Sequence, residues 1–115
     1  MALAPVSAQT CRERAESLVS KMTLEEKASQ LRFDSPAIPR LGIPAYNWWN
    51  ESLHGVARAG TATVFPQAIG LAAIFDEDFH EMVASVISTE ARAKYNGQSA
   101  HGDRDIYKGL SMWSP

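Results

Sequence analysis

The chain has 115 residues, enough for one small domain, and its 45% hydrophobic and 21% charged residues are ordinary proportions for a globular protein. Its net charge of −2 comes from 13 acidic and 11 basic residues without a basic stripe, which argues against nucleic acid and anionic membranes as partners. No apolar run is long enough to span a bilayer. The single cysteine, Cys11, can form neither an internal disulfide nor a zinc cluster.

The first ten residues, M-A-L-A-P-V-S-A-Q-T, are mostly small and apolar. Val6-Ser7-Ala8 fits the pattern before a signal-peptide cleavage site, but the charged start and the full apolar core are missing. Two interpretations of residues 1–10 therefore stay open, a signal-peptide remnant or a disordered N-terminus. The first favours a periplasmic or secreted protein and the second a cytoplasmic one. In either case, residues 11–115 make up one domain segment.

Two short helices are predicted next. Residues 12–21 form the first, and Thr23-Leu24-Glu25-Glu26 is a capping box, in which Thr23 caps the amide of Glu26 while the Glu26 side chain reaches back. The second helix is expected to run to about Leu31. Both helices should turn an apolar face inward, made of Ala15, Leu18, Val19, Leu24, Ala28 and Leu31.

Three prolines make residues 34–44 an extended or turning segment, because each proline also restricts the residue before it. Residues 45–49 indicate a short strand, followed by a compact loop over residues 50–60. Residues 63–66 are expected to touch the edge of the sheet, and residues 67–74 to form a short helix.

The clearest helix pattern runs from Asp76 to about Asn96, with Asp76 as N-cap and Gly97 as the stop. One apolar stripe recurs at spacings of three and four residues. It consists of Phe79, Met82, Val83, Val86 and Ile87. Residues 97–109 indicate a polar loop, and residues 110–115 the start of a strand.

The predicted order is helix, helix, strand, loop, helix and the start of a strand. That order opens an α/β fold but supplies too few strands to close one. We therefore expect the chain to be a piece of a larger protein and at best marginally stable alone, since a small domain that stands alone should close its own core.

The most informative segment is A-I-P-R-L-G-I-P-A-Y-N-W-W-N-E-S-L-H-G at residues 37–55. Tryptophan is large and rarely fully buried. A tryptophan pair beside Asn, Glu and His predicts a cleft wall with polar groups set among rings. Such a wall suits a sugar, whose C–H face stacks on a ring while its hydroxyls need charged partners.

Four blocks carry a resemblance to a known family, at residues 18–31, 37–57, 63–73 and 87–96. The chain resembles the N-terminal part of glycoside hydrolase family 3, the β-xylosidase and β-glucosidase family. The double tryptophan before N-E-S-L-H-G is similar to the xylosidase and arabinofuranosidase branch, because typical β-glucosidases carry Asp where Glu51 stands. The closing G-L-S-M-W-S-P is similar to the family's G-L-x-F-W-S-P strand.

The resemblance implies an incomplete N-terminal part of a TIM-type (β/α)₈ barrel, with the rest of the barrel and an α/β sandwich domain expected after it. It also implies retaining hydrolysis by two carboxyl groups about 5–5.5 Å apart. In the family both lie later in the chain, and the R-D-P-R-W-G-R segment that normally follows W-S-P is also missing here. We therefore expect no catalytic residue among these 115, no activity from this chain alone, and no cofactor.

The resemblance makes Glu51 the substrate-binding carboxylate, which can accept two charge-assisted hydrogen bonds from sugar hydroxyls. Trp49 would wall the pocket where a hexose places its C5 hydroxymethyl group, and so favour pentoses. The alternatives are a solvated Glu51 and a core Trp49. Trp48 should point the opposite way and be structural. His54 and Asn50 are predicted to support the site loop.

The favoured function is therefore the exo-hydrolysis of terminal β-D-xylose from oligosaccharides, as part of a longer enzyme. The same fold with another sugar, as β-glucosidase or α-L-arabinofuranosidase, stays open. So do a non-catalytic sugar-binding remnant and a stand-alone helical interaction domain. H-G-D-R-D at residues 101–105 supplies too few oxygen ligands for a divalent metal, and we interpret it as a solvated loop.

Overall fold

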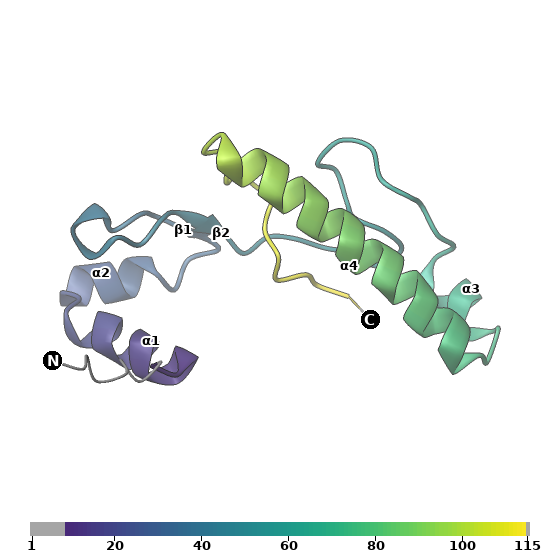
Figure 1. Cartoon of the computed structure of the whole chain (residues 1–115), viewed down its shortest axis with the longest axis horizontal. Helices are drawn as coiled ribbons and strands as arrows, with labels where there is room; N and C mark the ends of the chain where they lie inside the picture. The colour runs from purple at the N-terminus through teal and green to yellow at the C-terminus, as the bar shows by residue number, and fades with distance from the viewer. Residues whose placement is uncertain (1–8, 115) are drawn as a thin grey trace, which may run out of the picture.

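The computed structural model describes residues 9–114, so eight of the ten residues that suggested a signal peptide lie outside the described residues. The described chain is elongated (Figure 1), with a longest extent of 57 Å and a radius of gyration of 18.2 Å. A compact domain of 100 residues has a radius near 13 Å. Within residues 9–114, no helix is both long and apolar enough to cross a membrane.

The N-terminal region holds the two predicted helices and a small sheet, at one end of the molecule (Figure 1). Its helices are α1 (Cys11–Ser20) and α2 (Leu24–Ser29), and its strands are β1 (Asp34–Ser35) and β2 (Tyr46–Asn47). A 3-10 turn, η1 (Pro39–Leu41), lies between the strands. The strands pair antiparallel, and β2 is shorter than the strand predicted over residues 45–49.

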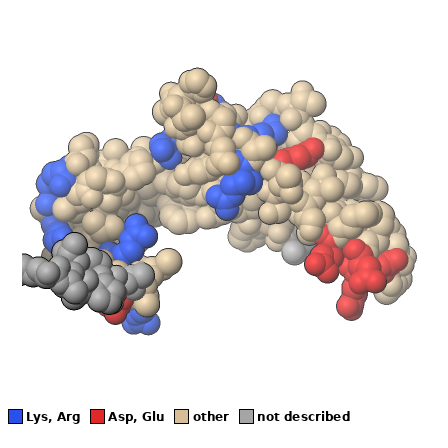
Figure 2. Space-filling view, in the orientation of Figure 1, with Lys and Arg blue, Asp and Glu red and all other residues tan. Residues whose placement is uncertain are grey.

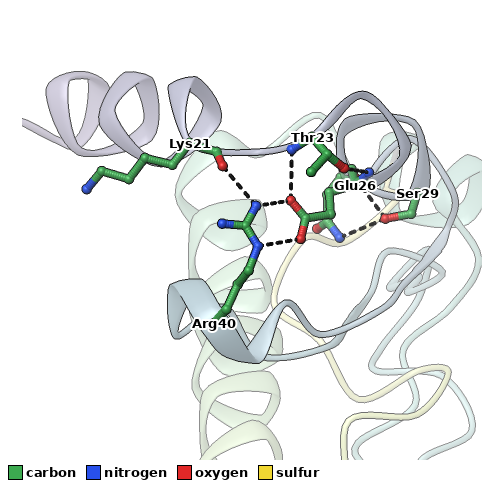
Figure 3. Close-up of polar contacts among 6 residues, drawn as sticks. Lys21, Thr23, Glu26, Ser29 and Arg40 are labelled. Carbon is green, nitrogen blue, oxygen red and sulfur yellow. Dashed lines mark hydrogen bonds and ion pairs between the residues drawn. The ribbon is translucent and has the colours of Figure 1, made fainter.

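The predicted capping box of α2 is confirmed, since Thr23 and Glu26 cap each other reciprocally. The same carboxylate forms a two-point ion pair with Arg40 from η1 (Figure 3), with Nε donating to Oε1 at 2.8 Å. Arg40 also donates to the Lys21 carbonyl at 2.8 Å. One arginine therefore joins η1 to the turn between α1 and α2. These bonds hold the pKa of Glu26 below its ordinary value, Arg40 contributing most and the Thr23 amide next.

The C-terminal region consists of the loop 50–66, the short helix α3 (Ala68–Ala72), the long helix α4 (Glu77–Ala100) and the last residues of the chain. Asp76 caps α4 as predicted and accepts a hydrogen bond from the Phe79 amide at 2.9 Å. Acidic side chains gather at the end of the molecule where α4 begins (Figure 2), and those of the first turn, Glu77 and Asp78, interact favourably with the positive end of the helix dipole.

The predicted stop of α4 at Gly97 is wrong, because the helix continues to Ala100. Glycine inside a helix costs only about 1 kcal/mol relative to alanine. After the cap residue His101, the chain turns away from the helix at Gly102, which has φ of +77°. Its amide donates to the Ser99 carbonyl, and the Asp103 amide donates to the Gln98 carbonyl. This pair of bonds is the Schellman motif, which satisfies the last helix carbonyls.

The inward apolar faces predicted for the helices are largely wrong for the described residues. Helices α1 and α2 contain no buried residue, and Leu24 and Leu31 are 77% and 90% exposed. In the α4 stripe, Val83 is buried but Met82 is 56% exposed. The periodicity identifies the apolar face of each helix. Within residues 9–114, however, too few other elements pack against these faces to bury them.

The predicted C-terminal strand start pairs with the loop after β2. The Ser52 amide donates to the Trp113 carbonyl at 2.8 Å, and the Trp113 amide donates to the Asn50 carbonyl at 2.8 Å. This is a parallel bridge between Glu51 and Trp113, with α4 in the connection. Residues 63–66 contact this loop and α4 instead of the sheet edge: the Phe65 amide donates to the His54 carbonyl at 2.8 Å.

Candidate functional site

Asn50 is the most buried residue of the candidate site, at 2% exposure. Its Nδ2 donates to the Asn47 carbonyl at 2.8 Å and to the Ser111 carbonyl at 3.3 Å, and its Oδ1 accepts from the Gly109 amide at 2.8 Å. A Cβ atom at Gly109 would lie 2.5 Å from this Nδ2, so only glycine fits there. Asn50 therefore joins β2 to the C-terminal segment, nearly 60 residues away in sequence.

The Tyr46 hydroxyl reinforces this junction from β2. Its oxygen accepts from the Leu110 amide at 2.7 Å and from the Ser111 amide at 3.0 Å. We call Tyr46, Asn47, Asn50 and residues 109–111 the polar junction. Because it satisfies buried backbone groups on both sides, it fixes where the segment 48–54 leaves the sheet.

The two tryptophans contact different aromatic partners. Trp49 packs edge-on against Phe33, with ring centroids 5.4 Å apart, and Trp48 packs edge-on against Tyr46 at 4.7 Å. Trp48 Nε1 also donates to the Ser35 hydroxyl at 3.1 Å. Each ring is 53% exposed, so neither is a core residue in this structure.

Glu51 lines a cleft of about 380 Å³ formed by its own loop. His54 and Gly55 also line it, and residues 56–58 and 60–62 with Val64 contribute most of the remainder. The cleft size is within the usual range for a small-molecule site. Trp49 does not line this cleft, so the structure brings Glu51 and His54 together but leaves Trp49 outside.

The loop is tightly folded on itself at Gly55. This residue has φ of +124°, and a Cβ atom there would lie 2.3 Å from the Thr63 carbonyl oxygen. Only glycine allows this close approach. The His54 carbonyl accepts a hydrogen bond from the Phe65 amide, whereas within residues 9–114 its ring makes none. His54 therefore contacts the loop through its backbone, and a supporting role of its side chain stays a prediction.

Sequence reasoning missed two strained residues beside the cleft. Arg58 and Tyr107 have φ of +59° and +63°, a region that side chains other than glycine rarely adopt. The Arg58 guanidinium lies over the Tyr107 ring, 5.1 Å from its centroid, and the Tyr107 amide donates to the Trp49 carbonyl at 3.0 Å. A cation–π contact therefore joins the cleft loop to the loop after α4.

Two side chains of α4, also missed, bind the cleft loop from outside. Glu90 accepts from the Thr63 amide at 3.0 Å and from the Thr63 hydroxyl at 2.6 Å. These two bonds hold the pKa of Glu90 below its ordinary value, the hydroxyl contributing most. Lys94, one turn further along, donates to the Ala59 carbonyl. Both residues belong to the block 87–96 that carries the family resemblance, but the sequence did not indicate their contacts with Thr63 and Ala59.

Within residues 9–114, no cluster of three or more His, Cys, Asp or Glu residues could hold a metal ion. In the H-G-D-R-D segment, Asp103 pairs with Lys108 at 2.7 Å. This contact holds the pKa of Asp103 below its ordinary value. The carboxylate is therefore already neutralised by a cation of the chain.

A larger cavity, of about 710 Å³, lies along α4 and is lined mostly by apolar groups, including Leu71, Val83, Ile87 and Met112. Its polar side chains, Ser52, His80, Ser88, Arg92 and Ser114, include no carboxylate that could accept hydrogen bonds from sugar hydroxyls. We therefore regard the smaller Glu51 cleft as the candidate site, and the larger cavity as the uncovered packing face of α4.

The chain is similar over most of its length to curated β-xylosidases. It is 50% identical over 113 residues to a probable exo-1,4-β-xylosidase of Aspergillus flavus, covering 89% of this chain and 14% of the relative. It is 44% identical over 108 residues to the xylan 1,4-β-xylosidase of Xylanibacter ruminicola, covering 92% and 12%. It is 46% identical over 113 residues to probable β-D-xylosidase 7 of Arabidopsis thaliana, covering 90% and 14%. No protein-family model matches the chain.

These similarities confirm the resemblance to β-xylosidase-type glycoside hydrolases that the motifs predict. The chain spans 12–14% of the length of these relatives, so each similarity concerns one segment of a longer enzyme. None of the names refers to glycoside hydrolase family 3, and membership of that family stays a prediction.

Proposed function

We propose that this chain serves as the N-terminal segment of a longer family 3 glycoside hydrolase that releases terminal β-D-xylose from oligosaccharides. The similarity to β-xylosidases over 89–92% of the chain carries the proposal. The chemistry would be retaining, with a carboxylate nucleophile and a carboxylic acid supplied by later parts of the enzyme. This segment would contribute sugar binding.

The parallel bridge between Glu51 and Trp113 supports the barrel part of the proposal. Parallel strands need a crossover connection, and here the connection contains α4. Strand, helix and parallel strand form the repeating unit of a (β/α)₈ barrel. Active sites of such barrels lie at the carboxyl ends of the strands, and Glu51 lies in the bridge itself, four residues after β2 ends at Asn47.

Glu51 is the proposed ligand of the sugar hydroxyls. A carboxylate with two free oxygens can accept from two neighbouring hydroxyls, and charge-assisted hydrogen bonds are roughly twice as strong as neutral ones. The Glu51 backbone is fixed by the bridge to Trp113 and by the bond from the Ala57 amide at 3.2 Å. The Glu51 side chain therefore projects from a backbone whose position is fixed by hydrogen bonds.

Trp49 is the proposed determinant of sugar size. Its ring is held at Phe33 and stays half exposed, so one face is free to limit the volume of a pocket that later segments complete. A bulky ring rejects a hexose by its extra hydroxymethyl group, worth about 1–3 kcal/mol of discrimination. The names of the relatives favour xylose over glucose or arabinose.

The test begins with the DNA beyond the codon for Pro115 and continues with expression of the complete reading frame. We expect activity on p-nitrophenyl β-D-xyloside that exceeds activity on the glucoside and the α-L-arabinofuranoside. Glu51→Gln should raise KM about tenfold, because it weakens binding of ground state and transition state alike. A stop codon after Pro115, or no xyloside activity in a folded full-length protein, would refute the proposal. Xylobiose binding by the 115-residue chain alone would instead support a sugar-binding remnant.

A further inference from the structure

The loop that carries the Glu51 cleft is held at two points by one helix. The Thr63 amide and hydroxyl bind the Glu90 carboxylate, and the Ala59 carbonyl binds Lys94. Glu90 and Lys94 are four residues apart on α4, so their side chains lie on the same face, one turn from each other. Their partners are likewise four residues apart in the loop.

The two anchor points bracket residues 60–62, which line the cleft together with Glu51. The backbone bonds within residues 57–60 are short turns: the Ala59 amide donates to the Ala57 carbonyl, and the Gly60 amide donates to the Arg58 carbonyl. These bonds shape the loop locally but do not attach it to the rest of the molecule. The contact of Arg58 with Tyr107 attaches the loop ahead of residues 60–62, and α4 holds both ends of that stretch, at Ala59 and Thr63.

A second link connects Thr63 to the Glu51 side of the cleft. The Thr63 carbonyl lies against Gly55, and the neighbouring Phe65 amide binds the His54 carbonyl. Moving Thr63 would therefore move two further residues that line the cleft with Glu51. A charged acceptor with two bonds to one residue restricts that residue more than a single neutral bond would.

We propose that Glu90 and Lys94 are positioning residues that set the width of the Glu51 cleft by holding the loop 59–63 on α4. The inference rests on the proposed sugar-binding function of Glu51. Neither residue lines the cleft. Their effect is on how well the preformed cleft matches the sugar in the ground state and the transition state alike, which changes KM and leaves kcat nearly constant.

The test measures KM and kcat separately for variants of the complete enzyme. Glu90→Ala removes both bonds to Thr63, whereas Glu90→Gln keeps one acceptor oxygen. We expect KM for the xyloside to rise about tenfold in Glu90→Ala and less in Glu90→Gln, with kcat within about twofold of the parent. A purely structural role would reduce the fraction of active enzyme, lowering kcat per total protein at constant KM.

The matched control is Glu81→Gln, an exposed glutamate of the same helix, which should leave both constants unchanged. Lys94→Met should raise KM. Lys94→Arg should keep KM near the parent value, because arginine can still donate to the Ala59 carbonyl. Thr63→Val and Glu90→Ala should be non-additive, since they break the same contact. An unchanged KM in Glu90→Ala and Lys94→Met overturns the proposal. If the parent lacks xyloside activity, or if Glu51→Gln leaves KM unchanged, the proposed function fails instead.

Discussion

The polar junction around Asn50 has nearly all of its hydrogen-bonding groups paired, whereas the apolar face of α4 is only partly covered by other residues. Asn50 satisfies three backbone groups, one in neighbouring β2 and two in the distant segment 109–111, and it is almost fully buried. Along α4, Val83 and Ala91 are the only buried residues, beside an apolar cavity of about 710 Å³. Polar groups form specific bonds with few neighbours, whereas an apolar face gains stability only from the area that other elements cover.

The largest effect is expected at the polar junction. Asn50→Ala leaves the Gly109 amide and two carbonyls without their partner, and each buried group left unpaired costs about 1–3 kcal/mol. Since we expect the chain to be marginally stable, this loss should remove its cooperative unfolding transition in urea. Asn96→Ala, at an exposed position on α4, is the control and should keep the transition. Equal behaviour of the two variants would mean that the junction does not hold the fold.

A smaller effect is expected on the apolar face. Val83→Ala removes two buried methyl groups, worth about 1–2 kcal/mol, whereas Val86→Ala at 38% exposure should lose less. Urea denaturation of the 115-residue chain measures this difference. In the complete protein, Val83→Ala and Val86→Ala should lower the free energy of unfolding by similar amounts if further elements cover α4. A persistent gap there would contradict the proposed barrel.

Sequence reasoning located the elements whose signals are local. The Thr23–Glu26 capping box and the Asp76 cap depend on residues three positions apart, and both form as predicted. The inward faces failed because burial depends on what lies opposite, and Leu31 has nothing there among residues 9–114. The periodicity of apolar residues predicts which face of a helix can be buried, but it does not predict whether another element of the chain packs against that face.

The candidate site shows the same division. The motif correctly marked residues 50–60 as a loop, and it drew attention to Asn50 without indicating that its side chain binds Gly109 and Ser111. The contacts of Glu90 with Thr63 span 27 residues and leave no local pattern. Contacts between distant segments become visible only when the backbone path is known.

The interior of α4 offers a stabilising change. Gly97 is helical, and a Cβ atom there would have open space. Gly97→Ala should therefore stabilise the chain by about 0.4–1 kcal/mol, because it reduces the entropy of the unfolded chain. Gly102→Ala, at φ of +77°, should destabilise it. Thermal unfolding followed by circular dichroism compares the two, and a destabilised Gly97→Ala would mean that α4 ends earlier than residue 100.

The smallest expected effect concerns acid stability in the N-terminal region. Arg40 and the Thr23 amide hold the folded-state pKa of Glu26 below its ordinary value of 4.5. Unfolding therefore binds a proton as the pH falls, so this contribution is complete above pH 4.5 and is lost as the pH drops through the lowered pKa. Glu26→Gln should flatten the decline of the urea midpoint below pH 4.5, and Arg40→Met should flatten it in the same direction, since it removes the main cause. An unchanged slope in both variants would show that the ion pair does not persist in solution, and η1 would then not be tied to the turn between α1 and α2.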